Sequence, residues 1–184
     1  MKPLVINLSL FKAGWLAAVF TAAATLPALG TAAVALVVAV HLARSERRRA
    51  EGWLLVVAAA FGLVWETLLV QTGTLSYSTG VIVDGIAPYW IVAMWVLFAT
   101  TLNIGMRWLR KSWVVAALAG AIGGPMSFIA GEKVGAVAFA DGTSSLLVIS
   151  AGWAVLLPLL VQIADALEAR DPGRSYSRTL VRES

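Results

Sequence analysis

Long apolar segments, separated by short polar ones, dominate the pattern of this chain. Four of them match the hydrocarbon core of a bilayer, which is about 30 Å thick and takes roughly 20 apolar residues in a helix. These segments are 53–70, 88–109, 113–130 and 143–167. Each is predicted to be a membrane-spanning helix, because a helix satisfies its own backbone hydrogen bonds in lipid.

The apolar segment near the N-terminus, residues 4–42, is too long for one helix. Pro27 and Gly30 interrupt it near its middle, and these residues are typical of a tight connection between helices. We therefore expect two spans there, over 6–26 and 28–43. The chain is thus predicted to be an all-α membrane bundle with six transmembrane helices.

An alternative for the N-terminus is a cleaved signal peptide over residues 1–28. In a signal peptide the basic residues precede the apolar run. Lys2 does so here, but Lys12 lies inside the run, which already begins at Leu4. The pattern therefore favours a first span that is retained in the mature protein.

Basic residues fall almost entirely on one side of the predicted bundle. Of the 14 Lys and Arg, all but Lys133 lie at the N-terminus, in the loops after the second and fourth spans, or in the tail. Because basic segments stay inside, both termini are predicted to be cytoplasmic. Residues 1–170 form the predicted transmembrane domain, and the polar segment 171–184 is expected to be a flexible cytoplasmic tail.

Composition agrees with a membrane protein and argues against several function classes. The 184 residues are 60% hydrophobic and 13% charged, whereas soluble domains carry about 25% charged residues. There is no Cys and a single His, His41, so we expect neither cysteine chemistry nor a metal site. We also expect no cofactor and no nucleic-acid partner, because membrane insertion and anionic lipid account for the basic loops.

Glu66 is the one acidic residue that lies well inside a predicted span. A charge in hydrocarbon costs about 2.5–3.5 kcal/mol or more, so an acid there is a candidate functional group. No basic residue lies three or four positions away on the helix. We take Glu66 as the candidate catalytic residue, acting as a neutral hydrogen-bond donor or a proton carrier. The alternative is a structural hydrogen bond to a neighbouring helix.

Other polar and aromatic residues are predicted at the same depth as Glu66, and this depth groups them as candidates for ligand binding. They are Tyr77, Asp84, Trp90 and Glu132. An exposed charge pair with Lys133 is the alternative for the last of them. The loop over 72–87 carries an apolar Val-Ile-Val stretch and is either a lid against the membrane or a plain connection.

The fifth span contains a Gly-Gly-Pro sequence that ends at Pro125. Proline has no backbone N–H, so a kink is expected. Gly120 and Gly124 are small residues four positions apart, a spacing that permits close helix contact. The stretch is either a packing face, within the chain or in a homodimer, or a broken helix that opens to a ligand. In the second case Gly124 and Pro125 are ligand-binding candidates.

Asn103 lies in the fourth span, about 22 Å from its outer end and too deep to bond Glu66 directly. A hydrogen bond to a neighbouring helix, worth about 0.6–2 kcal/mol, is one role for an asparagine in a span. Contact with a ligand is the other. His41 and Asp165 lie near span ends and are predicted to be interfacial.

Two sequence runs, PYWIVAMWVLFATTLN over 88–103 and GAIGGPMSFIAGEKVGA over 120–136, resemble a known family. Shorter matches are Asn7, Phe11, Trp15 and the segment from Trp153 to Pro158. The family consists of uncharacterised bacterial inner-membrane proteins with a domain of unknown function, often encoded beside cyclopropane-fatty-acid-synthase-like enzymes. Many relatives have Asp in place of Glu66, which keeps a protonatable group. The resemblance implies the bacterial inner membrane and a link to lipid modification, but no reaction.

Three functions stay open at this point. The main expectation is binding, presenting or modifying a fatty-acyl lipid near the outer half of the bilayer, with membrane lipids as partners and Glu66 as the acid. The second is a small proton-coupled transporter or flippase, which with six spans would need a homodimer through its glycine-rich faces. The third is a non-catalytic membrane scaffold. Whether the protein is an enzyme is left undecided by the sequence.

Overall fold

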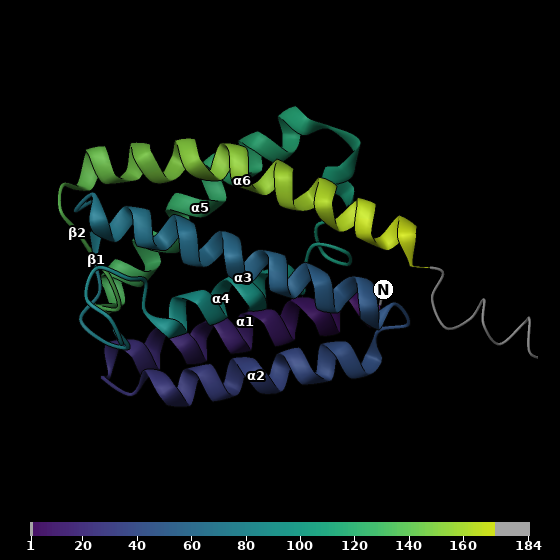
Figure 1. The fold of residues 1–184 in the computed structure, drawn as a ribbon, viewed down its shortest axis with the longest axis horizontal. Helices are drawn as coiled ribbons and strands as arrows, with labels where there is room; N and C mark the ends of the chain where they lie inside the picture. Colours follow the sequence, from purple (N-terminus) through teal and green to yellow (C-terminus); the bar gives the residue numbers. More distant parts are fainter. Residues whose placement is uncertain (1, 172–184) are drawn as a thin grey trace, which may run out of the picture.

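The computed structural model describes residues 2–171 and shows a bundle of helices with one short β-ribbon at an end (Figure 1). The elements are α1 Lys2–Ala23, α2 Pro27–Arg44, α3 Arg48–Gln71, β1 Leu75–Ser76, α4 Tyr89–Ala99, the short 3-10 helix η1 Arg107–Lys111, α5 Trp113–Val134, β2 Ala138–Phe139 and α6 Gly142–Arg170. The all-α class predicted for the chain is therefore confirmed.

Five helices, α1, α2, α3, α5 and α6, are long and apolar enough to cross a membrane. Large apolar side chains point outward along them, such as Leu36 on α2 and Leu147 on α6, which are 66% and 67% exposed. A soluble monomer does not expose apolar surface on this scale. The architecture is that of a multi-pass membrane protein.

The fourth predicted span, 88–109, is not one continuous helix. α4 ends at Ala99, and the chain continues through turns over 100–106 into η1. The hydroxyl groups of Thr100 and Thr101 each donate to a backbone carbonyl three residues earlier, both at 2.7 Å. Such local bonds compete with continuation of a helix, and the apolar pattern of the segment hides this break.

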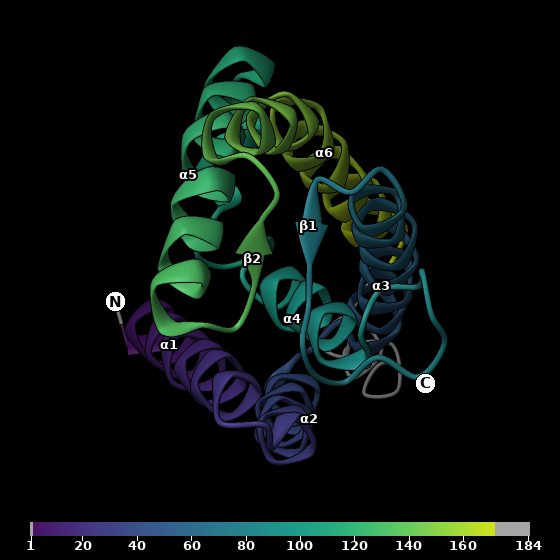
Figure 2. The same ribbon diagram turned by 90° about the vertical axis from the view of Figure 1, so that its left-hand side faces the viewer.

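The helix α4 lies in the centre of a ring formed by the other five helices (Figure 2). No residue from 87 to 103 is exposed, so α4 and the first part of the turns after it, up to Asn103, are surrounded by protein. Non-helical backbone is tolerated at membrane depth only when it is shielded in this way. The carbonyl of Thr100, which lies beyond the helix end, accepts a hydrogen bond from the side-chain amide of Asn7 at 3.0 Å.

The two ends of the bundle differ in character (Figure 1). At the end that we name the ribbon end, β1 and β2 pair antiparallel, with Leu75 opposite Phe139. The opposite end, which we name the basic end, holds the start of α1, the α2–α3 connection, η1 and the end of α6. Lys133 lies at the ribbon end. Four arginines lie at the basic end, where they line its cavity or hydrogen-bond to its polar side chains: Arg44, Arg47, Arg107 and Arg110. Which side of the membrane each end faces stays a prediction.

Most of the predicted tail, 171–184, lies outside the described residues. Asp171 is the exception and caps the C-terminal end of α6. Its carboxylate accepts a hydrogen bond from the backbone N–H of Ala50 at 3.0 Å. The end of α6 is thereby attached to the first turn of α3.

Both prolines singled out in the sequence lie within helices. Pro27 is the first residue of α2, where its missing N–H costs nothing. α5 runs continuously through Pro125, so the broken helix considered for this stretch is not observed. The carbonyl of Ala121, four residues before this proline, instead accepts a hydrogen bond from the hydroxyl of Ser150 on α6 at 2.7 Å.

Glycines on α3, α5 and α6 let tryptophan residues pack directly against helix backbones. A Cβ atom at Gly62 would lie 2.3 Å from Cγ of Trp95, and one at Gly124 would lie 2.3 Å from Cγ of Trp153. A Cβ at Gly120 would lie 2.1 Å from the carbonyl oxygen of Trp153. The spacing of Gly120 and Gly124 therefore serves contact between α5 and α6 within the chain.

Candidate functional site

Glu66 on α3 is completely buried, and its carboxyl group has a donor at each oxygen. Nε1 of Trp95 on α4 donates to Oε1 at 2.9 Å, and the hydroxyl of Tyr77 donates to Oε2 at 2.7 Å. One turn earlier, Gly62 leaves the space that the Trp95 ring occupies. None of the ion pairs formed within residues 2–171 involves Glu66.

This geometry accommodates both protonation states of Glu66. The indole N–H of Trp95 can only donate, so Oε1 accepts in either state. A tyrosine hydroxyl can donate or accept, so the contact between Tyr77 and Oε2 persists when that oxygen carries a proton. Burial, followed by the neighbouring carboxyl group of Glu66, raises the pKa of Tyr77 well above its usual value. The site can therefore exchange a proton without losing a hydrogen bond.

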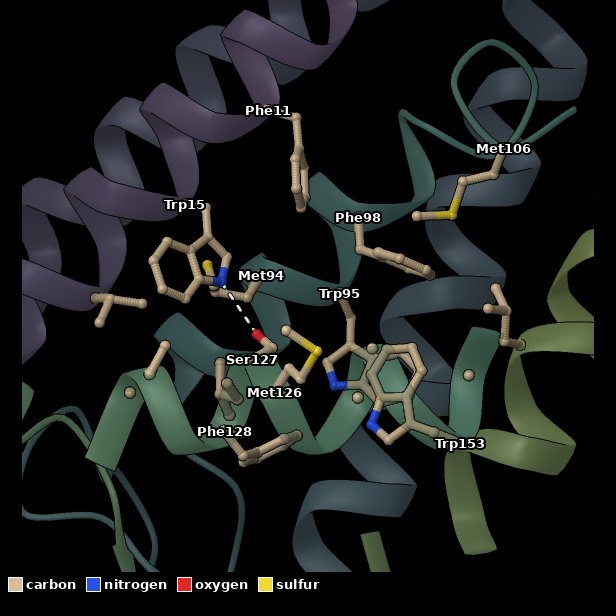
Figure 3. Close-up of a pocket in the computed structure, with 18 of the residues that line it drawn as sticks. Phe11, Trp15, Met94, Trp95, Phe98, Met106, Met126, Ser127, Phe128 and Trp153 are labelled. Atoms are coloured by element: carbon tan, nitrogen blue, oxygen red, sulfur yellow. Dashed lines mark hydrogen bonds between the residues drawn. The ribbon is translucent and has the colours of Figure 1, made fainter. Parts of the chain in front are cut away.

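A cavity of about 710 Å³ lies beside Glu66, with walls from α1, α4 and α5 (Figure 3). Cavities of about 300–1,000 Å³ are the usual size for small-molecule sites. Along α1 the lining extends from Leu8 to Val19, about 17 Å at 1.5 Å per residue. The labelled side chains in Figure 3 are almost all apolar or aromatic: Phe11, Trp15, Met94, Trp95, Phe98, Met106, Met126, Ser127, Phe128 and Trp153.

Aromatic rings form one wall of this cavity. Trp95 and Trp153 lie side by side (Figure 3) and are stacked, with ring centroids 4.7 Å apart and planes 20° from parallel. Phe98 meets Trp153 edge to face at 5.3 Å. The indole N–H of Trp153 has no hydrogen-bond partner among the described residues. The hydrogen bond from Trp95 to Glu66 thus fixes the Trp95 ring, on which the Trp153 ring stacks.

The cavity borders the outer surface of the bundle between α1 and α5. Met126 lines it and is 63% exposed. Lys12, which the sequence pattern assigned to the N-terminal flank, also lines it and is exposed. Nε1 of Trp15 on α1 donates to Oγ of Ser127 on α5 at 3.2 Å, the dashed line in Figure 3. This contact bridges the two helices that flank the opening.

Three of the ligand-binding candidates line the same cavity as Glu66: Tyr77 and Trp90, grouped with it by depth, and Gly124 of the Gly-Gly-Pro stretch. Trp90 is buried, with only 2% of its surface exposed. Its indole N–H donates to the carbonyl of Thr79 at 3.0 Å, and its ring meets Tyr77 edge to face at 5.6 Å. The Trp90 ring therefore packs against the Tyr77 ring and helps to hold it in position.

The other candidates do not join this group. Asp84 and Glu132 are exposed and do not line the cavity, because the chain around them turns both carboxylates toward solvent. Pro125 lies between two lining residues of α5 without lining the cavity itself. Asn103 lies at the basic end. Asp84 and Glu132 therefore do not lie with Glu66 at the cavity, and a role for them in ligand binding stays a prediction.

The loop after α3 is attached to the bundle at several points. The hydroxyl of Thr79 donates to the carbonyl of Ala22 on α1 at 3.0 Å. The backbone N–H of Ala87 donates to Oγ1 of Thr67 on α3 at 3.1 Å. Only the tip stays apolar and exposed, with Ile82 79% exposed. The loop forms a fixed cover over the ribbon end, and its exposed tip is suited to contact with lipid.

A buried polar network at the basic end was missed by the sequence pattern. His41 on α2 and Glu51 on α3 are 7% and 6% exposed, and Nε2 of the first lies 3.0 Å from Oε2 of the second. The side-chain amide of Asn103 donates to Oε1 of Glu51 at 2.9 Å, and Arg110 donates to Oδ1 of Asn103. His41 is thus buried at the basic end of the bundle, and its position at the membrane interface stays a prediction. The sequence did hold a signal for this network: a histidine near the end of α2 and an acid near the start of α3, on either side of a short connection.

A protein-family model described as a protein of unknown function, DUF2878, matches residues 4–159. The chain belongs to the DUF2878 family. This agrees with the resemblance to a membrane family of unknown function, and the matched range contains Glu66, Tyr77 and Trp95. Comparison with curated proteins and with solved structures gave no significant match. The chemistry of this DUF2878 chain has to be inferred from its site. Within residues 2–171, no cluster of three or more His, Asp or Glu side chains could hold a metal ion.

Proposed function

We propose that this DUF2878 protein binds a fatty-acyl lipid in the cavity beside Glu66. The observation that carries the proposal is the cavity itself, which is lined mainly by apolar side chains and opens between α1 and α5 toward the lipid-facing surface. An acyl chain can enter there from the membrane without crossing water. The lipid outside is as apolar as the cavity, so the hydrophobic effect does not drive the acyl chain into it. Binding is favoured instead by van der Waals contact between the acyl chain and the aromatic rings.

Lys12 supports a lipid with an anionic head. It lies about 15 Å from the first residue of α1 at 1.5 Å per residue, deep enough that an unpaired cation is costly. No ion pair within residues 2–171 involves Lys12. A carboxylate or phosphate on the bound lipid would supply its partner and fix the direction of the chain, with the acyl tail toward Trp95 and Tyr77.

Glu66 is the group in this proposal that can do chemistry. It would hold Trp95 and Tyr77 in the cavity wall. Among the described residues it is the one carboxyl group that lines the cavity, so it is the acid available to a polar or unsaturated group of the bound lipid. Glu66 lies nearer the ribbon end, which supports a site in the outer half of the bilayer if both termini are cytoplasmic. The proposed location is the bacterial inner membrane.

The proposal is tested by native mass spectrometry of the purified protein for retained lipid. Gly123 lines the cavity and has no atom within 4 Å of an added Cβ, so Gly123→Leu should narrow the cavity with a side chain whose Cβ meets no other atom. Gly52 on α3 is equally open but lies outside the cavity, so Gly52→Leu is the matched control. The wild type and Gly52→Leu should retain an acyl lipid, and Gly123→Leu should lose it. Equal retention by all three, or none by the wild type, rejects the proposal.

A second candidate is proton-coupled transport, favoured by a specific feature of α3. This helix carries two buried acids, Glu51 and Glu66, about 22 Å apart at 1.5 Å per residue, and each borders a cavity. Uptake driven by a pH gradient in proteoliposomes, lost in Glu66→Gln, would favour transport. Absence of both retained lipid and proton-driven uptake would leave a scaffold. The homodimer through glycine-rich faces, which a transporter with six spans would need, stays a separate proposal.

A further inference from the structure

A second cavity of about 540 Å³ lies at the basic end, between the inner faces of α1 and α2 and the turns after α4. Its polar lining includes three arginines, Arg44, Arg47 and Arg107. We propose that this cavity binds a phosphate group, supplied by a phospholipid headgroup or by free phosphate. The proposal does not depend on the cavity beside Glu66.

The acids of this cavity are largely occupied by other partners. Glu51 is engaged by the His41–Asn103 network described above. Glu168 binds Arg47 at 3.1 Å and Arg107 at 3.2 Å, and its side chain is 13% exposed. Arg110 binds the same carboxylate at 2.6 Å. Arg110 also pairs with Asp165 at 2.9 Å. Three arginines and three glutamates line the cavity, so an anion would bind there through arginine N–H groups that no carboxylate uses, those of Arg44 above all.

Arg44 has the greatest capacity to bind an anion. It is exposed at the end of α2, lines the cavity, and forms no ion pair among those of the described chain. Its guanidinium group can offer two parallel N–H donors to phosphate oxygens. The exposed Glu46 also lines the cavity, but its carboxylate is free to remain in water. Arg44 is therefore the residue on which phosphate binding should depend most.

Asn7 is an independent sign of a missing ligand. It is 7% exposed and lines this cavity. Its side-chain N–H₂ is fixed by donation to Thr100, whereas its Oδ1 is buried without a hydrogen-bond partner in the described residues. A buried unsatisfied oxygen costs free energy unless a donor reaches it. A hydroxyl or ammonium group next to the phosphate would be such a donor, which favours a headgroup over the bare ion.

The remaining lining suits a lipid with its tail still in the membrane. Ile6 and Leu10 on α1 and Val37 on α2 form an apolar side of the cavity. The two helices are in tight contact near the ribbon end, where a Cβ at Gly30 would lie 2.6 Å from Cα of Ala18. The cavity lies at the other end of this helix pair. An acyl chain can leave it along the apolar side while the phosphate stays among the arginines.

The test measures binding to the purified full-length protein in detergent, with short-chain phosphatidylglycerol, phosphatidylcholine of the same chain length, and inorganic phosphate as separate probes. Arg44→Gln removes the charge at the cavity. Arg49→Gln removes an equal charge from an exposed position of the same region that does not line it. Gly123→Leu serves as the background in which the first cavity is narrowed.

Phosphatidylglycerol should bind with micromolar or better affinity in the Gly123→Leu background, and Arg44→Gln should weaken it about tenfold through loss of a charge-assisted hydrogen bond. Arg49→Gln should leave it unchanged. If inorganic phosphate competes at a similar concentration, the phosphate group that binds is free phosphate. If it does not compete, the phosphate group belongs to a lipid headgroup. Equal weakening by both arginine variants, or binding of phosphatidylcholine as tight as phosphatidylglycerol and insensitive to Arg44→Gln, would overturn the proposal.

Discussion

The carboxyl group of Glu66 joins three segments that are distant in sequence. It belongs to α3, while Tyr77 follows β1 and Trp95 lies in the middle of α4. Each donor is an aromatic side chain that lines the cavity. A single buried acid therefore sets the position of two rings in the wall.

Replacing Glu66 separates the hydrogen-bonding role from the acidic one. In Glu66→Gln the amide oxygen can accept from Trp95 and the amide N–H₂ can donate to the oxygen of Tyr77, so stability should change little. Glu66→Leu leaves two buried polar groups unpaired, at a cost of about 1–3 kcal/mol each. Thermal unfolding in detergent measures both. Equal destabilisation by the two variants would show that the charge, not the pair of bonds, stabilises the fold.

The sequence predicts part of this site at the residue scale. Glu66 stands out because an acid inside an apolar span is rare, and depth alone groups it with Tyr77. Trp95 could not be chosen as its partner, because a tryptophan in an apolar run looks the same whether it faces lipid or a buried acid. Gly62, which makes room for that ring, has no signal at all without its neighbour on α4.

At the scale of elements, the contact between α5 and α6 rests on Gly124 rather than on the adjacent Gly123. A Cβ at Gly124 collides with Trp153, whereas one at Gly123 meets nothing within 4 Å. Gly124→Ala should therefore destabilise the protein by roughly 1–3 kcal/mol through overpacking. Gly123→Ala should be neutral or stabilise by up to about 1 kcal/mol, since alanine favours a helix. Similar unfolding temperatures for the pair would contradict this packing.

The proline in α5 is matched by a serine in α6. Ser150→Ala should cost about 1 kcal/mol, because the carbonyl of Ala121 then has no partner. In a Pro125→Ala background the helix supplies its own N–H to that carbonyl, so the same serine change should cost almost nothing. A double-mutant cycle on unfolding free energies measures this coupling. Strictly additive effects would mean that the hydroxyl and the proline are unrelated.

Helices were easier to predict than their interruptions. Apolar length identifies the long helices because lipid tolerates little else, and Pro27 marks the start of α2 correctly. The break after Ala99 was missed, since two threonines and an asparagine in an apolar run do not show that the surrounding helices will shield the turns. The pairing of β1 with β2 depends on segments more than 60 residues apart, and no local pattern signals it.

At the scale of the whole molecule, the arrangement makes a claim about topology. The start of α1 and the end of α6 lie at the same end of the bundle, and the basic residues favour the cytoplasm for that end. A fluorescent protein fused after Ser184 should fluoresce, and alkaline phosphatase fused there should be inactive. Phosphatase inserted after Asp84, in the exposed loop of the ribbon end, should be active. The reverse pattern would invert the orientation.

The central claim, an acyl chain in the cavity between α1, α4 and α5, is tested most directly by photo-crosslinking. A fatty acid with a diazirine in its chain is added to the protein in nanodiscs, and the modified residues are mapped by mass spectrometry. The account predicts labelling of cavity residues such as Met94 and Phe98, competed away by unlabelled fatty acid and absent in Gly123→Leu. Labelling confined to outward-facing residues such as Leu36 and Leu147, with none in the cavity, would contradict it.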